Sequence, residues 1–260
     1  MTNPEPNPHS GTSAEATEDE RVHREMRRRS RRAFITAFLA AGAGYGGWRW
    51  LMSRPHLDNL PSPFRKMLQL NERITSKVLD PNRRIREVSE NSVTAGGPRV
   101  NGDIGLNSDI DFDNWRLQIV GTNLSFRLDD LKTLPSVNQV TPLNCIEGWT
   151  TVARWTGIRL ADFVDKFYPA ARKYAYASLA TPDGQYYVGL DAPSAFHPQT
   201  LLCYEINGEP LTVSHGAPLR LLIPTKYGIK NLKRIGTIHF TDNRPRDYWA
   251  EQGYDWFAGL

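Results

Sequence analysis

Between residues 115 and 241 the chain contains many short apolar segments, most of them followed closely by proline, glycine or asparagine. The segment 115–121 alternates apolar and polar residues, as a half-buried strand does. Thr-Pro-Asp-Gly at 181–184 and Asn-Gly at 207–208 favour tight turns. Strands and helices do not alternate as they do in repeated βαβ units. The pattern therefore predicts an α+β fold in which short helices accompany mixed β-sheets.

The expected elements follow from this periodicity. A short strand turning into a helix is expected at 126–134, and a helix at 158–168. We expect strands at 115–121, 137–143, 174–179, 186–190, 201–206, 219–223 and 235–241. The tail 242–260 mixes aromatic and charged residues, and we expect it to cover the core irregularly and to help shape a pocket.

One of the two cysteines, Cys145, directly follows the predicted strand 137–143. A thiol there fits a metal ligand, a nucleophile, half of a disulfide or a small buried residue. Free cysteine is among the most buried residue types, so its position alone favours the core. Cys203 is the other cysteine, and we interpret it as a buried apolar residue, although a bridge to Cys145 stays open in an oxidising compartment.

Charge and length narrow the class of protein. With 260 residues there is room for one large domain and extensions. The net charge of +4 is small, and much of the basic excess lies at 27–32. The chain has no zinc-finger spacing and no basic–aromatic platform, so we do not expect nucleic-acid binding.

The N-terminal part predicts export. Residues 1–29 offer little to bury and are expected to form a disordered extension. Residues 30–52 read as a twin-arginine-type signal or a membrane anchor, because Arg31 and Arg32 precede the apolar, glycine-rich run 33–48. That run is shorter than the roughly 20 residues that span a bilayer comfortably. We expect membrane proximity through residues 33–52, and both cleavage and retention of this segment stay open.

A linker is expected at 53–94, with the domain proper at 95–260. Apolar residues from Phe64 to Leu79 recur at helical spacing and stop before Pro81, which predicts a helix within the linker. We expect this helix to be a solvated spacer between the membrane-proximal part and the domain.

A basic residue stands inside the apolar strand 219–223. Arg220 would be costly to bury there unless an anion pairs with it. A phosphate group and an internal carboxylate are both suitable partners. Further cations follow in the glycine-bearing loop 226–234.

Two motifs carry a resemblance to a known family. The first is Cys145-Ile146-Glu147-Gly148-Trp149, and the second is the run 215–220, His-Gly-Ala-Pro-Leu-Arg, with the loop that follows it. Together they resemble the molybdopterin-binding domain of the sulfite oxidase family, and within it the periplasmic protein-methionine-sulfoxide reductase catalytic subunits. The resemblance covers roughly 99–260 and implies a sulfite oxidase-like molybdopterin-binding fold.

The resemblance also implies roles for individual residues. It makes Cys145 the ligand of molybdenum, places Glu147 near the metal and puts Arg99 opposite the substrate. It implies a molybdenum-molybdopterin cofactor bound by Arg99, Asn101, Cys145, His215, Arg220, Asn231, Leu232 and Lys233. A further polar contact is implied after the strand 174–179, where Ser178, Ala180 and Thr181 stay equal candidates.

The function implied is that of an exported molybdopterin-dependent oxidoreductase, periplasmic or anchored to the outer face of the cytoplasmic membrane. It would transfer an oxygen atom at a small-molecule or protein-bound sulfoxide or sulfite, in a direction that the sequence leaves open. Electrons would be exchanged with a separate partner, such as a membrane haem protein. The alternative is an exported, cofactor-free binding or structural domain that keeps the same fold.

Overall fold

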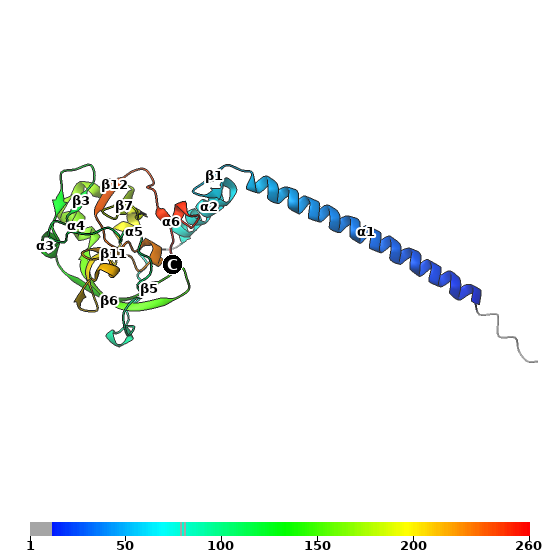
Figure 1. Cartoon of the computed structure of the whole chain (residues 1–260), viewed down its shortest axis with the longest axis horizontal. Helices are drawn as coiled ribbons and strands as arrows, with labels where there is room; N and C mark the ends of the chain where they lie inside the picture. Colours follow the sequence, from blue (N-terminus) through cyan, green and yellow to red (C-terminus); the bar gives the residue numbers. More distant parts are fainter. Residues whose placement is uncertain (1–11, 79, 81) are drawn as a thin grey trace, which may run out of the picture. The chain divides into compact units, whose positions relative to one another are not determined.

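The computed structural model describes residues 12–260 except 79 and 81, and the chain divides into two compact units, at residues 1–55 and 56–260 (Figure 1). The first unit is dominated by one helix. The second contains all of the strands found in the described part of the chain.

Helix α1, Thr12–Met52, makes up nearly all of the described part of the first unit. It replaces the disordered extension predicted for 12–29, whereas 1–11 lie outside the described residues. Glutamate and arginine spaced four apart favour a helix here, as in the pairs Arg24–Glu20 and Arg29–Glu25. Apolar side chains such as Phe34, at 74% exposure, face solvent in the segment after the basic run. No described helix combines the length and apolarity that crossing a membrane requires.

The second unit begins with a small hairpin and helix α2, Ser62–Val78. The hairpin strands are β1, His56–Leu57, and β2, Leu60–Pro61. Helix α2 is not the solvated spacer that we expected, because Arg65 is 2% exposed and donates to the carbonyl oxygens of Tyr254 and Ala250. Glu72 pairs with Arg244 at 2.7 Å. The helix therefore packs through polar side chains, and its apolar stripe stays exposed.

The segment after α2 also belongs to the second unit rather than to a free linker. Ile85 exchanges two hydrogen bonds with the side-chain amide of Gln199. Val88 donates to the carbonyl oxygen of Val140, and Thr94 to that of Val152. The segment contains a short 3₁₀ helix, η1, Glu90–Ser92.

Two five-stranded sheets form the body of the unit (Figure 1). In the first, the order is β10-β9-β6-β5, with β11 pairing to β9, and all pairs are antiparallel. Its strands are β5, Val137–Asn144; β6, Thr150–Arg159; β9, Leu201–Ile206; β10, Glu209–Pro210; and β11, Arg220–Leu222.

In the second sheet the order is β4-β3-β12-β7-β8, and the β12–β3 pair is parallel. Its strands are β3, Leu117–Ile119; β4, Ser125–Phe126; β7, Tyr176–Ala180; β8, Tyr187–Asp191; and β12, Thr237–Thr241. Antiparallel pairs and one parallel pair make this a mixed sheet, as predicted.

Short helices lie between the strands and after the last of them. They are α3, Leu128–Lys132; α4, Leu160–Phe167; η2, Pro169–Lys173; α5, Ala192–Ala195; η3, Val213–His215; η4, Gly228–Lys230; and α6, Tyr248–Glu251. Helix α4 buries Leu160, Phe163 and Val164 in the larger apolar core, with residues of both sheets. A smaller core forms around Trp155.

The α+β fold class is thus confirmed, with most of the predicted strands close to their expected positions. Strand β6 was not predicted. It directly precedes α4, so the helix expected at 158–168 begins two residues later than predicted.

Candidate active site

Cys145 lies in the tight turn that joins β5 to β6. Its backbone N–H donates to the carbonyl oxygen of Trp149 at 2.9 Å, and Gly148 donates back to the carbonyl of Cys145 at 3.1 Å. Gly148 has φ of +86°, a left-handed conformation that glycine adopts without strain. The Cys-x-Glu-x-Trp motif is therefore a hairpin loop that holds the partly exposed thiol at the end of two long strands.

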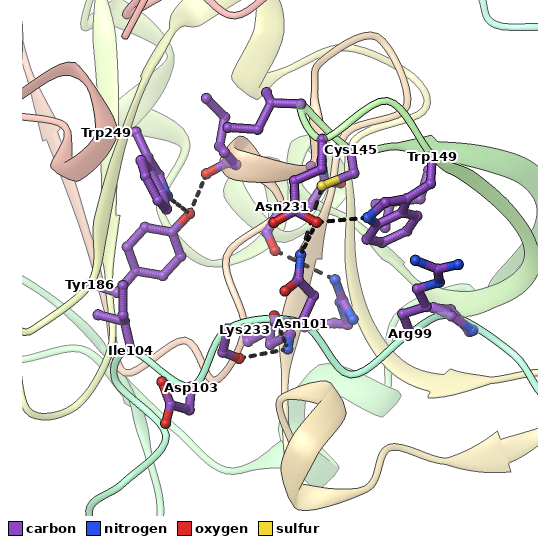
Figure 2. Close-up of a pocket in the computed structure, with 18 residues that line it drawn as sticks. Arg99, Asn101, Asp103, Ile104, Cys145, Trp149, Tyr186, Asn231, Lys233 and Trp249 are labelled. Atoms are coloured by element: carbon purple, nitrogen blue, oxygen red, sulfur yellow. Dashed lines mark hydrogen bonds between the residues drawn. The ribbon is translucent and has the colours of Figure 1, made fainter. Parts of the chain in front are cut away.

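The thiol faces a cavity of about 280 Å³ (Figure 2). Five separate stretches of chain and the tail helix α6 contribute to its walls. The lining residues are Pro98, Arg99, Asn101, Gly102, Asp103, Ile104, Leu143, Cys145, Ile146, Glu147, Trp149, Tyr186, Arg220, Gly228, Ile229, Asn231, Lys233 and Trp249. Seven of the nine predicted site residues are among them.

Arg220 is the buried cation of this cavity, at 3% exposure. Its guanidinium donates to the carbonyl oxygens of His215 at 3.1 Å and Asn231 at 3.5 Å, and lies 4.9 Å from the centre of the Trp155 ring. The Nε–H has no acceptor within the described chain, and no described carboxylate pairs with the group. Burial lowers the pKa of Arg220 to about 10. The sequence also allowed an internal carboxylate as the partner of Arg220. No described carboxylate takes this role.

Lys233 supplies a second cation. Its ammonium donates to the backbone carbonyls of Asn101 at 2.8 Å and Gly102 at 3.1 Å. Burial, and then repulsion from Arg220, lower the pKa of Lys233 to about 8. Lys233 thus holds the loop 99–103 at the edge of the cavity, and its ammonium loses its proton at a lower pH than an ordinary lysine does.

Glu147 accepts two hydrogen bonds on one oxygen. Trp149 Nε1 donates at 2.9 Å and Asn101 Nδ2 at 3.1 Å, and the same amide nitrogen is 3.8 Å from Cys145 Sγ. These hydrogen bonds hold the pKa of Glu147 below its usual value. Arg99 lies over the ring of Trp149, 5.6 Å from its centre. The residues around the thiol therefore form one connected polar network.

His215 does not line the cavity, contrary to the direct contact that the motif implied. Its Nε2 donates to the carbonyl oxygen of Pro98 at 3.0 Å, and its Nδ1 pairs with Thr212 Oγ1 at 2.8 Å. Both ring nitrogens are therefore used within the protein. Gly216, at φ +97°, allows close approach, because a Cβ there would lie 2.8 Å from Lys233. The His-Gly pair positions Arg220 and the loop at Pro98.

The segment 231–233 contributes in two different ways. Asn231 accepts from the Ile223 N–H at 2.7 Å and donates to the Tyr227 carbonyl at 3.1 Å, so its side chain holds the loop in place. Leu232 is fully buried in the larger core and does not reach the cavity. In this segment, the groups that remain available to contact a cofactor directly are therefore the side chain of Lys233 and the backbone.

Among the three candidates after β7, Thr181 is buried, and its hydroxyl donates to Asp183 at 2.6 Å. None of the three lines the cavity. Tyr186 and Trp249 do line it, and the motifs did not indicate them. The aromatic tail was the one sequence signal, since it was expected to help shape a pocket.

Cys203 lies outside the cavity and is fully buried, as predicted. Burial raises the pKa of its thiol to about 12. Both cysteines are free, so the disulfide that the sequence left open does not form.

These residues fit a phosphate-bearing metal cofactor. A partly exposed thiol becomes a soft anionic ligand when it loses its proton to a metal, and Arg220 has an orphaned buried donor suited to a phosphate. One cavity thus offers both a ligand for a soft metal and a cation for a phosphate.

Comparison with known proteins agrees with this assignment. Residues 104–249 match the family described as "Oxidoreductase molybdopterin binding domain", and the chain belongs to that family. The predicted family is thereby confirmed.

Individual relatives cover different shares of the chain. A relative from Azospira oryzae, provisionally named protein-methionine-sulfoxide reductase subunit YedZ1, is 32% identical over 230 residues, which cover 86% of this chain and 87% of that protein. The protein-methionine-sulfoxide reductase catalytic subunit MsrP of Xanthomonas campestris is 38% identical over 141 residues, covering 49% of this chain and 44% of that protein. The MsrP of Campylobacter jejuni is 28% identical over 178 residues, which cover 60% of this chain and 60% of that protein.

Among solved structures, the sulfane dehydrogenase SoxCD of Paracoccus pantotrophus is similar, with a TM-score of 0.47 and 18% identity. The match covers 53% of this chain and 40% of that one.

Proposed function

We propose that this protein is the catalytic subunit of a molybdopterin-dependent sulfoxide reductase that acts on methionine sulfoxide or a similar alkyl sulfoxide. The names of the Azospira and Xanthomonas relatives support this substrate class. The overall reaction takes a sulfoxide, two electrons and two protons to a thioether and water.

One observation carries the proposal. The buried guanidinium of Arg220 has no carboxylate partner in the described chain, yet it lines the same cavity as the Cys145 thiol. A buried cation without an anion is unfavourable. A cofactor that brings a phosphate for Arg220 and a soft metal for Cys145 satisfies both groups at once.

The roles of the residues follow from this arrangement. Cys145 would hold molybdenum, and Arg220 and Lys233 would bind the phosphate. When bound, the cofactor supplies the oxygen-atom and electron exchange. Glu147 and Asn101 would orient the surroundings of the thiol through their shared hydrogen bond. Arg99, at the exposed side of the cavity, would donate to the oxygen of the substrate.

A sulfoxide fits this cavity better than sulfite does. Ile104, Ile146 and Ile229 line it together with two tryptophans, which suits alkyl groups. Sulfite is a small anion with no apolar part to bury, and it would rely on Arg99 alone once the other cations bind phosphate. Sulfite oxidation is therefore the second candidate, favoured by Arg99.

The electrons would come from a separate redox partner, such as a membrane haem protein. The word "subunit" in the relatives' names supports a second component. We also propose that the protein is exported and is either periplasmic or anchored to the membrane, and the pair Arg31-Arg32 before an apolar run supports this proposal.

The export proposal has its own test. Replacing Arg31 and Arg32 by lysine keeps the positive charge but removes the arginine pair. We expect the variant to stay in the cytoplasm, measured by cell fractionation, with its molybdenum content unchanged. Unaltered export would show that the pair acts only as a topology signal.

The catalytic proposal is tested by assaying the purified protein with a reduced viologen dye as electron donor. We expect oxidation of the dye that depends on methionine sulfoxide, together with about one molybdenum per chain. Sulfite-dependent reduction of an electron acceptor, without sulfoxide reduction, would favour the second candidate. Protein that is folded and metal-free even when produced with abundant cofactor would favour the cofactor-free binding domain.

A further inference from the structure

Trp249 forms one wall of the cavity, across from Trp149 and with Cys145 between them in the view of Figure 2. It comes from helix α6 in the tail, far in sequence from the motifs of the site. Its position therefore depends on how the tail is held.

The polar edge of Trp249 is already used within the protein. Its indole N–H donates to the hydroxyl of Tyr186 at 3.0 Å, and that hydroxyl donates to the carbonyl oxygen of Ile229 at 2.5 Å. Trp249 thus has no hydrogen-bond donor left for a ligand. What it offers to the cavity is apolar ring surface.

Neighbouring rings fix the indole in place. Tyr254 and Tyr248 contact it edge to face, with centroid distances of 5.1 and 5.5 Å. Such contacts favour one orientation of the ring. A wall that is already ordered loses little conformational entropy when a ligand binds.

Helix α6 is itself anchored to the cavity loop. Asp247 caps it by accepting from the Ala250 N–H at 3.0 Å, and it pairs with Lys230 at 2.5 Å with both side chains buried. Lys230 belongs to η4, the short helix that also brings Gly228 and Ile229 to the cavity. The tail and the cavity loop are therefore joined by one buried ion pair.

Resting on the proposed function, we propose that Trp249 is a specificity-determining residue that binds the alkyl arm of the sulfoxide substrate. Ile104 and Ile229 line the same cavity and complete an apolar surface. Sulfur and methylene groups pack favourably against aromatic rings. The substrate class is then a sulfoxide with an alkyl chain of several carbons, as in methionine sulfoxide, in preference to dimethyl sulfoxide.

The first experiment replaces Trp249 in the full, cofactor-loaded protein. We expect Trp249→Gln to raise the KM for methionine sulfoxide about tenfold, equivalent to about 1.4 kcal/mol. Trp249→Leu keeps an apolar wall and should raise it less than threefold. Neither variant should change molybdenum content, and both should raise the KM for dimethyl sulfoxide less than the KM for methionine sulfoxide. Phe112→Ala, an exposed aromatic that does not line this cavity, is the control.

A second measurement needs only the unaltered protein. Along the series dimethyl, ethyl methyl and methyl propyl sulfoxide, we expect KM to fall roughly three- to fourfold per added methylene, in line with burial of each group. A KM independent of chain length would overturn the inference even if the Trp249 variants did not fold.

The remaining outcomes distinguish a failure of the proposed role of Trp249 from a failure of the proposed sulfoxide reductase function. Sulfoxide reduction in which Trp249→Gln and Trp249→Leu behave alike overturns the role of Trp249 alone. Loss of molybdenum in both variants would make Trp249 a cofactor contact and would also overturn it. No reduction of any sulfoxide by the loaded, unaltered protein would overturn the proposed function together with the inference.

Discussion

Arg220 Nη1 donates to the backbone carbonyl oxygen of His215 at 3.1 Å, although the two residues belong to different short elements. The imidazole of His215 in turn donates to the carbonyl of Pro98. His215 thereby links Arg220, the first residue of β11, to the loop at Pro98. The guanidinium is held at a fixed position before any cofactor binds.

The first prediction concerns this guanidinium. We expect Arg220→Met to reduce cofactor affinity about ten- to a hundredfold, because a charge-assisted hydrogen bond contributes roughly 1.5–3 kcal/mol. Purified protein should then contain substoichiometric molybdenum and melt at a lower temperature than the loaded, unaltered protein. Mass spectrometry of the metal and thermal unfolding measure the two effects.

Arg116→Met is a suitable control for this change. Within the described residues, Arg116 donates to the backbone carbonyls of Asp113 and Trp115, and it does not line the cavity. It should retain full metal. If the Arg220 variant also purified with full metal and an unchanged melting temperature, the phosphate would be bound elsewhere.

The buried side chain of Lys226 predicts that the stability of the fold depends on pH. The residue is 4% exposed, and its ammonium has no hydrogen-bond partner in the described chain and lies over the Phe257 ring. Burial lowers its pKa from 10.5 to about 7. Between these values the unfolded chain binds a proton that the folded chain lacks, so this residue makes stability rise with pH.

We therefore expect Lys226→Met to be more stable than the unaltered protein at pH 6, with a difference that shrinks towards pH 10. The largest difference should be on the order of a few kcal/mol. Denaturant unfolding of the cofactor-free protein across this pH range measures it. Parallel stability curves for the two proteins would contradict the lowered pKa.

The buried pair of Lys230 and Asp247 should be strongly coupled. Lys230→Met leaves the Asp247 carboxylate buried without its cation, which we expect to destabilise the fold by about 3–5 kcal/mol. Adding Asp247→Asn removes the uncompensated charge and should restore part of this loss. A double-mutant cycle in urea tests the coupling, and a single-variant loss below about 1 kcal/mol would show that the pair does not anchor α6.

Much of the fold could be predicted because its strands carry regular patterns. The antiparallel pair β7 and β8 is joined by a Thr-Pro-Asp-Gly turn that marks both ends. Strand β6 was missed for a physical reason. Its fully buried positions include Thr151 and Ala153, whereas the apolar Val152 between them is only partly buried. Hydrophobicity therefore does not follow the buried face of this strand.

The candidate site was predicted where it depends on local sequence. Cys145 and Glu147 occupy one hairpin turn, so their spacing in the chain fixes their spacing in space. The orientation of His215 was not predictable, because it is set by a carbonyl 117 residues away. Trp249 reaches the cavity only through the packing of α6, for which no local pattern exists. The orientation of His215 and the position of Trp249 are therefore both set by long-range packing and not by local sequence.

The proposed role of Cys145 as the ligand of molybdenum is tested most directly by the metal content of three proteins. The unaltered protein and Cys203→Ala should each contain about one molybdenum per chain, since Cys203 is buried outside the cavity and acts only by packing. Cys145→Ser should unfold at a similar denaturant concentration when cofactor-free, yet contain little molybdenum and reduce no sulfoxide. A folded Cys145→Ser protein with full molybdenum and full turnover would contradict the central claim.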